Sequence, residues 1–226
     1  MKRNKIKDRL IRKIKIIHNL NLNHNLTLFL TLILSALFIS CGKNYSPLQK
    51  AYIAQVEKER EEKNIEMKND PDSPFNKKGK IEFHNLKYFD VDPAYVFKSK
   101  LYEYNPKDTI IIYGTKGELR HVVKFGCVLV NIDGKVIKVN VYQGTTNGGM
   151  IYYSIWFTDN TTNNESYGVG RYIDFEKADN PENIYTIDFN SAYNPYCAYS
   201  PNYSCAVPTK EDFIPVEIKA GEKKFH

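Results

Sequence analysis

The stretch LRHVVKFGCVLVNIDGKVIKVNVYQ (residues 119–143) decides the fold of this chain. Two runs within it, 119–130 and 136–143, alternate apolar with other residues and are rich in valine. Such alternation predicts β-strands, because successive side chains of a strand point to opposite faces. The connection NIDG (131–134) contains an Asp-Gly pair, which favours a tight β-hairpin. We therefore expect an antiparallel sheet around this hairpin.

Further strand-like runs, rich in Val, Ile, Tyr and Phe, lie on both sides of the hairpin. They are residues 95–104, 109–113, 151–157, 166–175, 184–189 and 213–218. Short turns, among them Asn105-Pro106, separate them, and no helical pattern lies between them, so parallel crossover units are not expected. The prediction is a mainly β fold, an antiparallel meander of about eight strands that closes into a barrel or a sandwich. The sequence does not decide between a barrel and a sandwich.

A helix is expected before the strands. Ser46-Pro47 places an N-cap residue ahead of a proline at the first helical position, and Leu48, Tyr52 and Val56 follow at helical spacing. The charged run EKEREEK that comes next is typical of a solvated helix. Two interpretations stay open. The helix is a spacer that packs one short apolar stripe on the domain, or it is an arm that binds a partner.

The N-terminus has the features of an export signal. A basic leader (1–27) precedes the uncharged apolar run LFLTLILSALFIS (28–40), and Cys41 follows. The run is shorter than the roughly 20 residues of a membrane span. It resembles a bacterial lipoprotein signal, in which Cys41 becomes the lipidated first residue; the alternative is an uncleaved anchor helix. Both interpretations predict a chain in the bacterial cell envelope, on the exported side, attached to a membrane through its N-terminus.

The net charge of +6 belongs to the leader. Residues 1–27 hold eight of the 32 basic residues and one of the 26 acidic residues, which leaves 24 basic and 25 acidic residues in the rest. Because the rest of the chain has no excess of positive charge, nucleic acid is not expected as a partner.

Three blocks of sequence indicate a family. They are YGTKGELRHVVKFGCVLVNIDGKVIKVNVYQ (113–143), FTDNTTNNESYGVGRYIDF (157–175) and DFNSAYNPYCAYSPNYSCAVPTKEDFIPVEIKAGEK (188–223). With these blocks the chain resembles the bacterial and archaeal family named domain of unknown function 1684, as a lipoprotein-type member. The resemblance implies a fold and an envelope location, but it supplies no chemistry, because no activity is assigned to the family.

Three segments are expected along the chain. A lipoprotein signal peptide covers residues 1–40, and a tether with the N-terminal helix covers residues 41–72. The β-rich domain of unknown function 1684 then covers residues 73–226.

Four cysteines need separate interpretations. Cys41 is the lipidation candidate, and Cys127 lies among apolar residues of a predicted strand, where it is expected to be a small buried residue. Cys197 and Cys205 lie in an aromatic loop, and in an oxidising compartment their spacing suits a disulfide. Metal ligands and unpaired thiols, one of them a nucleophile, are the alternatives. No paired Cys-x-x-Cys motif accompanies them, so no metal and no cofactor is expected.

Arg171 is the most informative charged residue. In the predicted strand 166–175 it shares a face with apolar residues, and a desolvated guanidinium needs a carboxylate or carbonyl partner. The candidate carboxylates are Asp159, Glu165 and Asp188. Arg171 either holds the loop 190–205 on the sheet or binds an anion in a pocket. The candidate pocket residues are Tyr167, Arg171, Asp188, Asn190, Tyr193, Asn194, Tyr199 and Glu211.

Two classes of function follow from these residues, and the sequence leaves open whether the chain is an enzyme. The first is a membrane-tethered binding or structural β-domain with a Tyr/Arg-lined pocket for a small molecule, a glycan or an envelope protein. The second is an envelope hydrolase that uses the region of Arg171, Tyr193 and Cys197. A third, weaker candidate, a flavin-binding split barrel, lacks the cluster of basic residues that a phosphate would need.

Overall fold

The predicted hairpin forms the centre of the structure. In the computed structural model, β3 (Leu119–Ile132) and β4 (Lys135–Thr145) pair antiparallel from Ile132 opposite Lys135 to Val123 opposite Gln143. Asp133 and Gly134 both have positive φ (52° and 77°), which a two-residue hairpin turn of this type requires. This part of the sequence prediction is confirmed.

The structure describes residues 43–226 except residue 147. The expected signal peptide at 1–40 and the lipidation candidate Cys41 lie outside the described residues. No helix among the described residues is both long and apolar enough to span a membrane.

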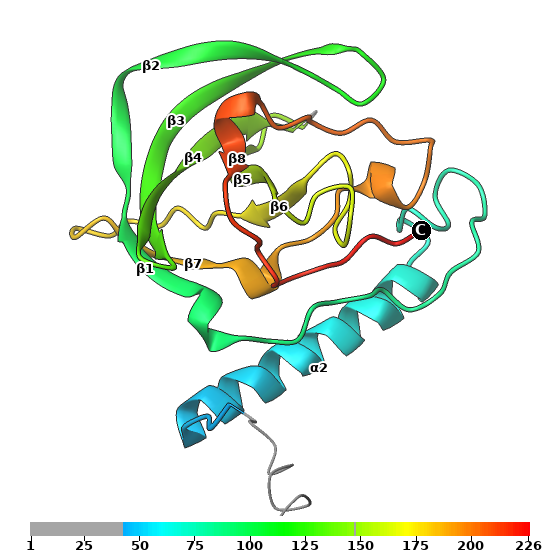
Figure 1. Cartoon of the computed structure of the whole chain (residues 1–226). Coiled ribbons are helices and arrows are strands. Elements are labelled where there is room, and N and C mark those ends of the chain that lie inside the picture. The colour runs from blue at the N-terminus through cyan, green and yellow to red at the C-terminus, as the bar shows by residue number, and fades with distance from the viewer. Residues whose placement is uncertain (1–42, 147) are drawn as a thin grey trace, which may run out of the picture. The chain divides into compact units, whose positions relative to one another are not determined.

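A curled sheet surrounds the hairpin and forms an open half-barrel (Figure 1). Its strands run in the order β2-β3-β4-β5-β6 as an antiparallel meander, while β8 pairs parallel with β5 and β1 pairs only with β7. The bounds are β1 Val96–Lys100, β2 Tyr102–Tyr113, β5 Ile151–Asp159, β6 Arg171–Asp174, β7 Ile184–Asp188 and β8 Phe213–Ile214. The mainly β prediction is confirmed, with the parallel β8 as an exception to the meander.

One predicted strand is in fact two. The run 95–104 divides at Leu101, which is 1% exposed, because β1 pairs with β7 whereas β2 pairs with β3. The expected turn at Asn105-Pro106 is wrong, since β2 continues through it with a shift of register between Glu103 and Asp108. A bulge accommodates a proline, which has no N–H to donate.

Another predicted strand is much shorter than expected. Instead of residues 166–175, β6 covers only Arg171–Asp174, because the chain turns before it and the Gly170 N–H donates to the Tyr167 carbonyl (3.0 Å). Gly170 has a φ of 109°, and a Cβ there would lie 2.6 Å from the Phe157 oxygen. The glycine therefore lets two backbone segments approach closely and leaves no space for a ligand at this point.

The main core lies inside the curled sheet, where residues of β3, β4, β5 and β6 pack on β7 and on the C-terminal segment. A second cluster joins the end of α2 to the loop 190–205, called the tyrosine-rich loop from here on, through Met67, Phe75 and Tyr199. Short 3₁₀-helices lie before β1 and between β7 and β8 in the described residues: η1 Pro93–Tyr95, η2 Phe189–Ser191, η3 Tyr196–Ala198 and η4 Lys210–Asp212.

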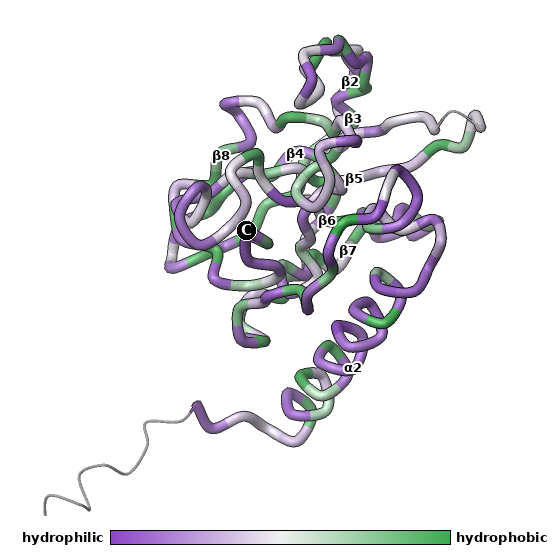
Figure 2. The backbone as a smooth tube through the Cα atoms, turned by 90° about the vertical axis from the view of Figure 1, so that its right-hand side faces the viewer, coloured by the Kyte–Doolittle hydropathy of each residue, from purple (hydrophilic) through white to green (hydrophobic). Residues whose placement is uncertain are grey.

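The predicted N-terminal helix is α2 (Pro47–Asn69), capped by Ser46 in a capping box with Gln49. The expected apolar stripe is only partly correct, because Val56 is buried but Leu48 is 82% exposed. Figure 2 shows a mostly hydrophilic helix. Polar side chains of Tyr52, Arg60 and Lys63 attach it to the domain. Of these contacts, the Arg60 guanidinium donates to the Phe89 carbonyl (2.8 Å).

Candidate functional site

Arg171, the residue that sequence reasoning favoured, is 1% exposed, and both of its Nη atoms donate to its own chain, while its buried Nε has no partner among the described residues. Its Nη2 donates to Asp159 (2.7 Å) and to the Ile218 carbonyl (2.8 Å), and its Nη1 donates to the Ala220 and Glu222 carbonyls. Asp159 is one of the three predicted partners. The guanidinium holds the C-terminal segment 218–222 on the sheet, however, and not the loop 190–205. Arg171 thus has the predicted holding role, but it acts on the C-terminal segment.

The tyrosine-rich loop is held by a carboxylate that sequence reasoning missed. Glu222 is 1% exposed and accepts hydrogen bonds from the Asn194 N–H (2.9 Å) and the Tyr199 hydroxyl. It also forms an ion pair with Lys63 of α2 (2.7 Å). One buried acid therefore joins the loop, the C-terminus and the helix. In the sequence, Glu222 lies in a charged tail and carries no pattern that distinguishes it.

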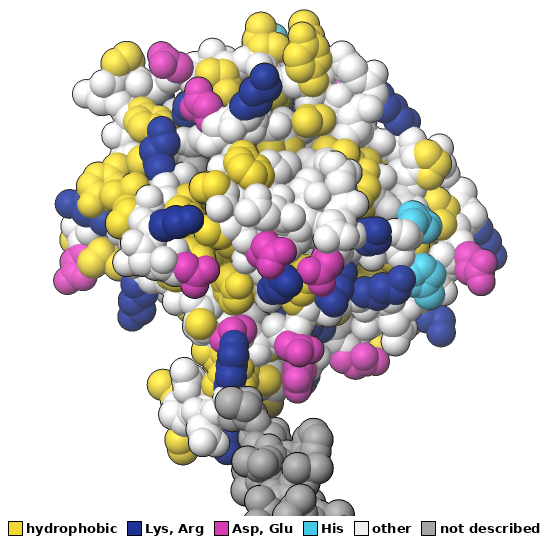
Figure 3. Space-filling view, viewed as in Figure 1, with side chains coloured by type: hydrophobic (Ala, Val, Ile, Leu, Met, Phe, Trp, Pro, Cys, Tyr) yellow, Lys and Arg dark blue, Asp and Glu magenta, His cyan; other side chains and the backbone are white. Residues whose placement is uncertain are grey.

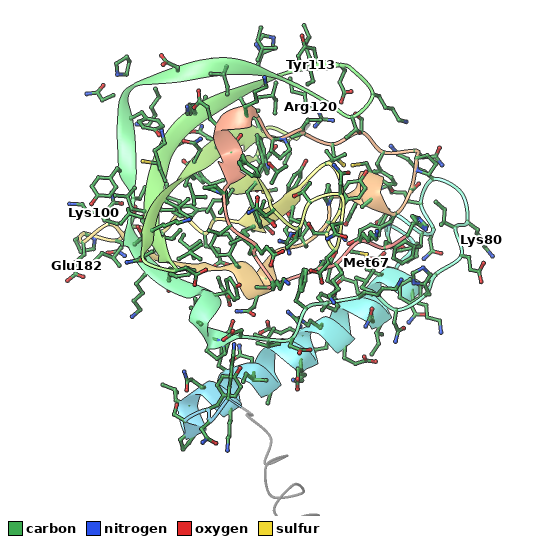
Figure 4. The ribbon with its side chains drawn as sticks, in the orientation of Figure 1. Met67, Lys80, Lys100, Tyr113, Arg120 and Glu182 are labelled. Atoms are coloured by element: carbon green, nitrogen blue, oxygen red, sulfur yellow. The ribbon has the colours of Figure 1, made fainter. Side chains whose placement is uncertain are left out.

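A cavity of about 660 Å³ lies between α2 and this loop. Its α2 wall consists of Glu59, Glu62, Lys63, Glu66 and Met67. The opposite wall consists of Tyr172, Asp174, Tyr193, Pro195, Tyr196, Tyr203, Ser204 and Cys205. Figure 4 shows Met67 near the C-terminal end of α2, and Figure 3 shows charged side chains gathered where α2 meets the domain.

The charges around this cavity are mainly negative. Four carboxylates line it, and Lys63 is the one basic residue in the lining. Because Lys63 is paired with buried Glu222, it neutralises little of that charge. Within residues 43–226, leaving out 147, no ion pair engages Glu59 or Glu66.

The aromatic wall is neutral and partly unsatisfied. Tyr196 and Tyr203 pack edge-on with centroids 5.2 Å apart. Burial raises the pKa of Tyr172 and Tyr193, so both stay protonated phenols. The hydroxyl of Tyr203 is buried and makes no hydrogen bond with the described residues.

A smaller cavity of about 180 Å³ lies nearer the N-terminus of α2. It shares Glu59, Lys63 and Tyr193 with the larger one. Asp188 and Asn190 also line it. Asp188 accepts a hydrogen bond from the Tyr52 hydroxyl (2.5 Å), so its carboxylate serves to attach α2.

The eight predicted pocket residues thus separate into groups. Tyr193 lines both cavities, and Asp188 and Asn190 line the smaller one. The other five are absent from both linings: Arg171, Asn194 and Tyr199 are buried, Tyr167 lies against Cys197, and Glu211 pairs with Lys124. Sequence reasoning missed the acids of α2, since the charged run EKEREEK was interpreted as the solvated part of the helix.

The two loop cysteines lie together as thiols beside the larger cavity. The Cys197 N–H donates to the Cys205 sulfur (3.3 Å), and the Tyr167 hydroxyl lies 3.7 Å from the Cys197 sulfur. The disulfide between them stays a prediction. Cys127 is buried, as expected.

The described residues do not place a histidine beside the loop cysteines, nor do they form a metal-binding group. The ring of His84 stacks on Phe225 (centroids 3.8 Å apart), and His121 is exposed on β3. In the described part of the chain, no hydrogen bond joins a histidine to either loop cysteine, and no group of three His, Cys, Asp or Glu residues could hold a metal ion.

Comparison with known proteins identifies the family of the chain. The model of the family "Protein of unknown function (DUF1684)" matches residues 80–223. The chain belongs to this family. Because α2 precedes residue 80, the helix wall of the larger cavity lies outside the matched part of this DUF1684 protein.

A solved structure supports the fold of the DUF1684 domain. The solution NMR structure of an uncharacterized protein of Haloarcula marismortui is 24% identical, covers 77% of this chain and 95% of its own, and has a TM-score of 0.57. At this identity the similarity shows the fold alone. No curated protein matches the chain.

Proposed function

We propose that this DUF1684 protein is a binding protein of the cell envelope, tethered to a membrane by Cys41, and that its larger cavity binds a small organic cation. The cavity between α2 and the tyrosine-rich loop carries this proposal. It combines concave shape, four carboxylates and four tyrosines in one lining. Ligand sites are concave, largely apolar surfaces with a few convergent polar groups.

Charge favours a cation over the other ligands that a tyrosine-lined pocket could hold. An anion would meet Glu59, Glu62, Glu66 and Asp174 with no free basic residue in the lining. A neutral sugar could stack on the tyrosines and donate hydroxyl hydrogen bonds to the carboxylates, but it would leave their negative charge uncompensated. An alkylammonium group satisfies both, because tyrosine faces attract cations and carboxylates accept their hydrogen bonds.

The chain's own lysines support this chemistry. The Lys63 ammonium lies 4.9 Å from the centroid of the Tyr193 ring, and the Lys78 ammonium lies 4.4 Å from that of Tyr203. Both rings belong to the lining of the larger cavity. Two rings of the wall thus already make cation–π contacts, with ammonium groups of the chain itself.

The envelope location rests on the leader and the apolar run ahead of Cys41. A hydrolase in the region of Arg171, Tyr193 and Cys197 gains no support, because Arg171 is sequestered and neither histidine contacts the thiols. The proposed function is therefore ligand binding and not catalysis.

Isothermal titration calorimetry on the full chain in detergent tests the proposal, with spermidine and tetramethylammonium as cationic probes and succinate as the anionic one. We expect the cations to bind and succinate not to bind. Glu66→Gln should weaken spermidine about threefold to tenfold, equivalent to about 1 kcal/mol. Glu182→Gln is the matched control, because Glu182 is exposed and lies far from Met67 (Figure 4). No heat from either cation, or equal effects of the two variants, would contradict it.

A further inference from the structure

Cys197 and Cys205 lie next to each other at the edge of the larger cavity. Both side chains are half-buried, and Cys205 contributes to the cavity lining. Thr115 anchors the second cysteine: its N–H donates to the Cys205 carbonyl (2.9 Å) and its hydroxyl accepts from the Cys205 N–H (3.2 Å). The two thiols are therefore held against each other by the backbone on both sides.

Two groups beside the Cys197 sulfur favour its thiolate, and one of them, the Tyr167 hydroxyl, is 3.7 Å from it. The thiol of Cys205 and then the hydroxyl of Tyr167 stabilise its thiolate, and together they lower the pKa of Cys197 to about 6 against the opposing effect of burial. The same interaction raises the pKa of Cys205. Cys197 is thus the thiolate at neutral pH and Cys205 keeps its proton, which is the division of roles found in reactive dithiols.

We propose that Cys197 and Cys205 form a redox-active dithiol that exchanges with small-molecule disulfides, with Cys197 as the attacking sulfur and Cys205 as the resolving sulfur. The Cys197 thiolate attacks one sulfur of R–S–S–R, forms a mixed disulfide and releases R–S⁻, which takes a proton from water. Cys205 then attacks the Cys197 sulfur, and the second R–S⁻ leaves with the proton of Cys205. The dithiol loses two electrons, and one R–S–S–R becomes two R–SH.

The surroundings favour a reversible bond over a purely structural one. Contacts that stabilise the thiolate stabilise the reduced form, and a stabilised reduced form makes the disulfide easier to reduce. The loop also has another anchor, because buried Glu222 binds Asn194 and Tyr199. A disulfide is therefore not needed to hold the loop in place.

Alkylation of the wild-type full chain provides a test that needs no substitution. After reduction and removal of the reductant, iodoacetamide is added at pH 7 and each cysteine is followed by peptide mass spectrometry. We expect Cys197 to react roughly tenfold or more faster than Cys205, since the thiolate is the nucleophile. Cys127 serves as an internal control, because it is buried and should stay unmodified. Preferential modification of Cys205, or equal rates, would overturn the assignment of roles.

Glutathione disulfide then tests the exchange itself. The cationic disulfide cystamine is used beside it, because the acidic cavity lining disfavours the net negative glutathione disulfide. With either reagent the wild-type chain should gain the Cys197–Cys205 bond and release two small thiols, whereas Cys205→Ser should retain one small thiol on Cys197. Tyr167→Phe should slow the exchange severalfold at pH 7 and regain the wild-type rate at pH 9, where the thiol ionises without help. Absence of the mixed disulfide in Cys205→Ser, with circular dichroism equal to wild type, would overturn the proposal. An equal slowing of Tyr167→Phe at both pH values would overturn the role of its hydroxyl.

Discussion

Lys63 of α2 and Glu222 near the C-terminus form an ion pair with 2.7 Å between Nζ and Oε1, in which the carboxylate is 1% exposed. The same carboxylate accepts from the Asn194 N–H and the Tyr199 hydroxyl. The acid wall of the larger cavity, which α2 supplies, is therefore attached at the same point that fixes the aromatic wall. A change at this pair should disturb both walls together.

Lys63→Met should lower the free energy of unfolding by about 1–3 kcal/mol, because it leaves Glu222 buried without its cation. Lys58→Met is the matched control on the same helix. Its partner Glu62 and Lys58 itself are exposed (61% and 76%), so a change within about 0.5 kcal/mol is expected. Urea midpoints of both variants check this, and equal midpoints would contradict the docking role of the pair.

Arg171→Lys should cost about 1–3 kcal/mol of stability, because an ammonium cannot replace a guanidinium that donates to Asp159 and to three carbonyls. Arg171→Met should cost at least as much, since it leaves buried Asp159 unpaired. Arg120→Lys is a control that should cost less stability than Arg171→Lys, because the side chain of Arg120 is partly exposed (36%). If chemical denaturation finds Arg171→Lys as stable as wild type while spermidine binding is lost, Arg171 serves a ligand and our interpretation is wrong.

Cys41→Ala should release the protein from the membrane fraction of the producing cell, because the variant cannot carry the proposed lipid attachment. Fractionation with detection of the protein in membrane and soluble fractions measures the effect. Retention of the variant at full length in the membrane would favour the uncleaved anchor helix instead.

If the proposed envelope location, lipidation of Cys41 and pairing of Cys197 with Cys205 hold, protein isolated without reductant should contain one free thiol after denaturation, Cys127. Quantification with a thiol reagent decides this. Three free thiols would contradict the predicted pairing in that compartment.

Alkylation of reduced Cys197 should follow an apparent pKa of about 6, well below the usual thiol range. The sign follows from the hydrogen bonds of Cys205 and Tyr167, which favour the thiolate, so the rate should rise between about pH 5 and 7 and then level off. Iodoacetamide rates across that range provide the measurement. A rate that keeps rising to pH 9 would show an ordinary thiol.

Local pattern was sufficient for part of the fold. The hairpin at Asp133-Gly134 and the start of α2 at Ser46 depend on neighbouring residues, so the sequence predicted both. The division at Leu101 and the late start of β6 depend on which distant strand pairs with which, and no local alternation records that choice.

The site was harder to predict than the fold. Arg171 was recognised as a buried guanidinium, and Asp159 was among its predicted partners, because desolvation demands such a partner. Its carbonyl partners come from a segment about 50 residues away, which spacing cannot indicate. The acids of α2 look solvated in the sequence, and only the docking of Lys63 on Glu222 places them beside the tyrosines.

Cation binding in the larger cavity is the central claim, and an NMR titration of the full chain in detergent micelles with spermidine tests it most directly. We predict that amide shifts change together in residues 59–67 of α2, in residues 193–205 and in β6, which line the cavity. The turn around Glu182, also acidic and exposed, should stay unchanged. Shifts of equal size at Glu182, or none in the cavity walls, would contradict the claim.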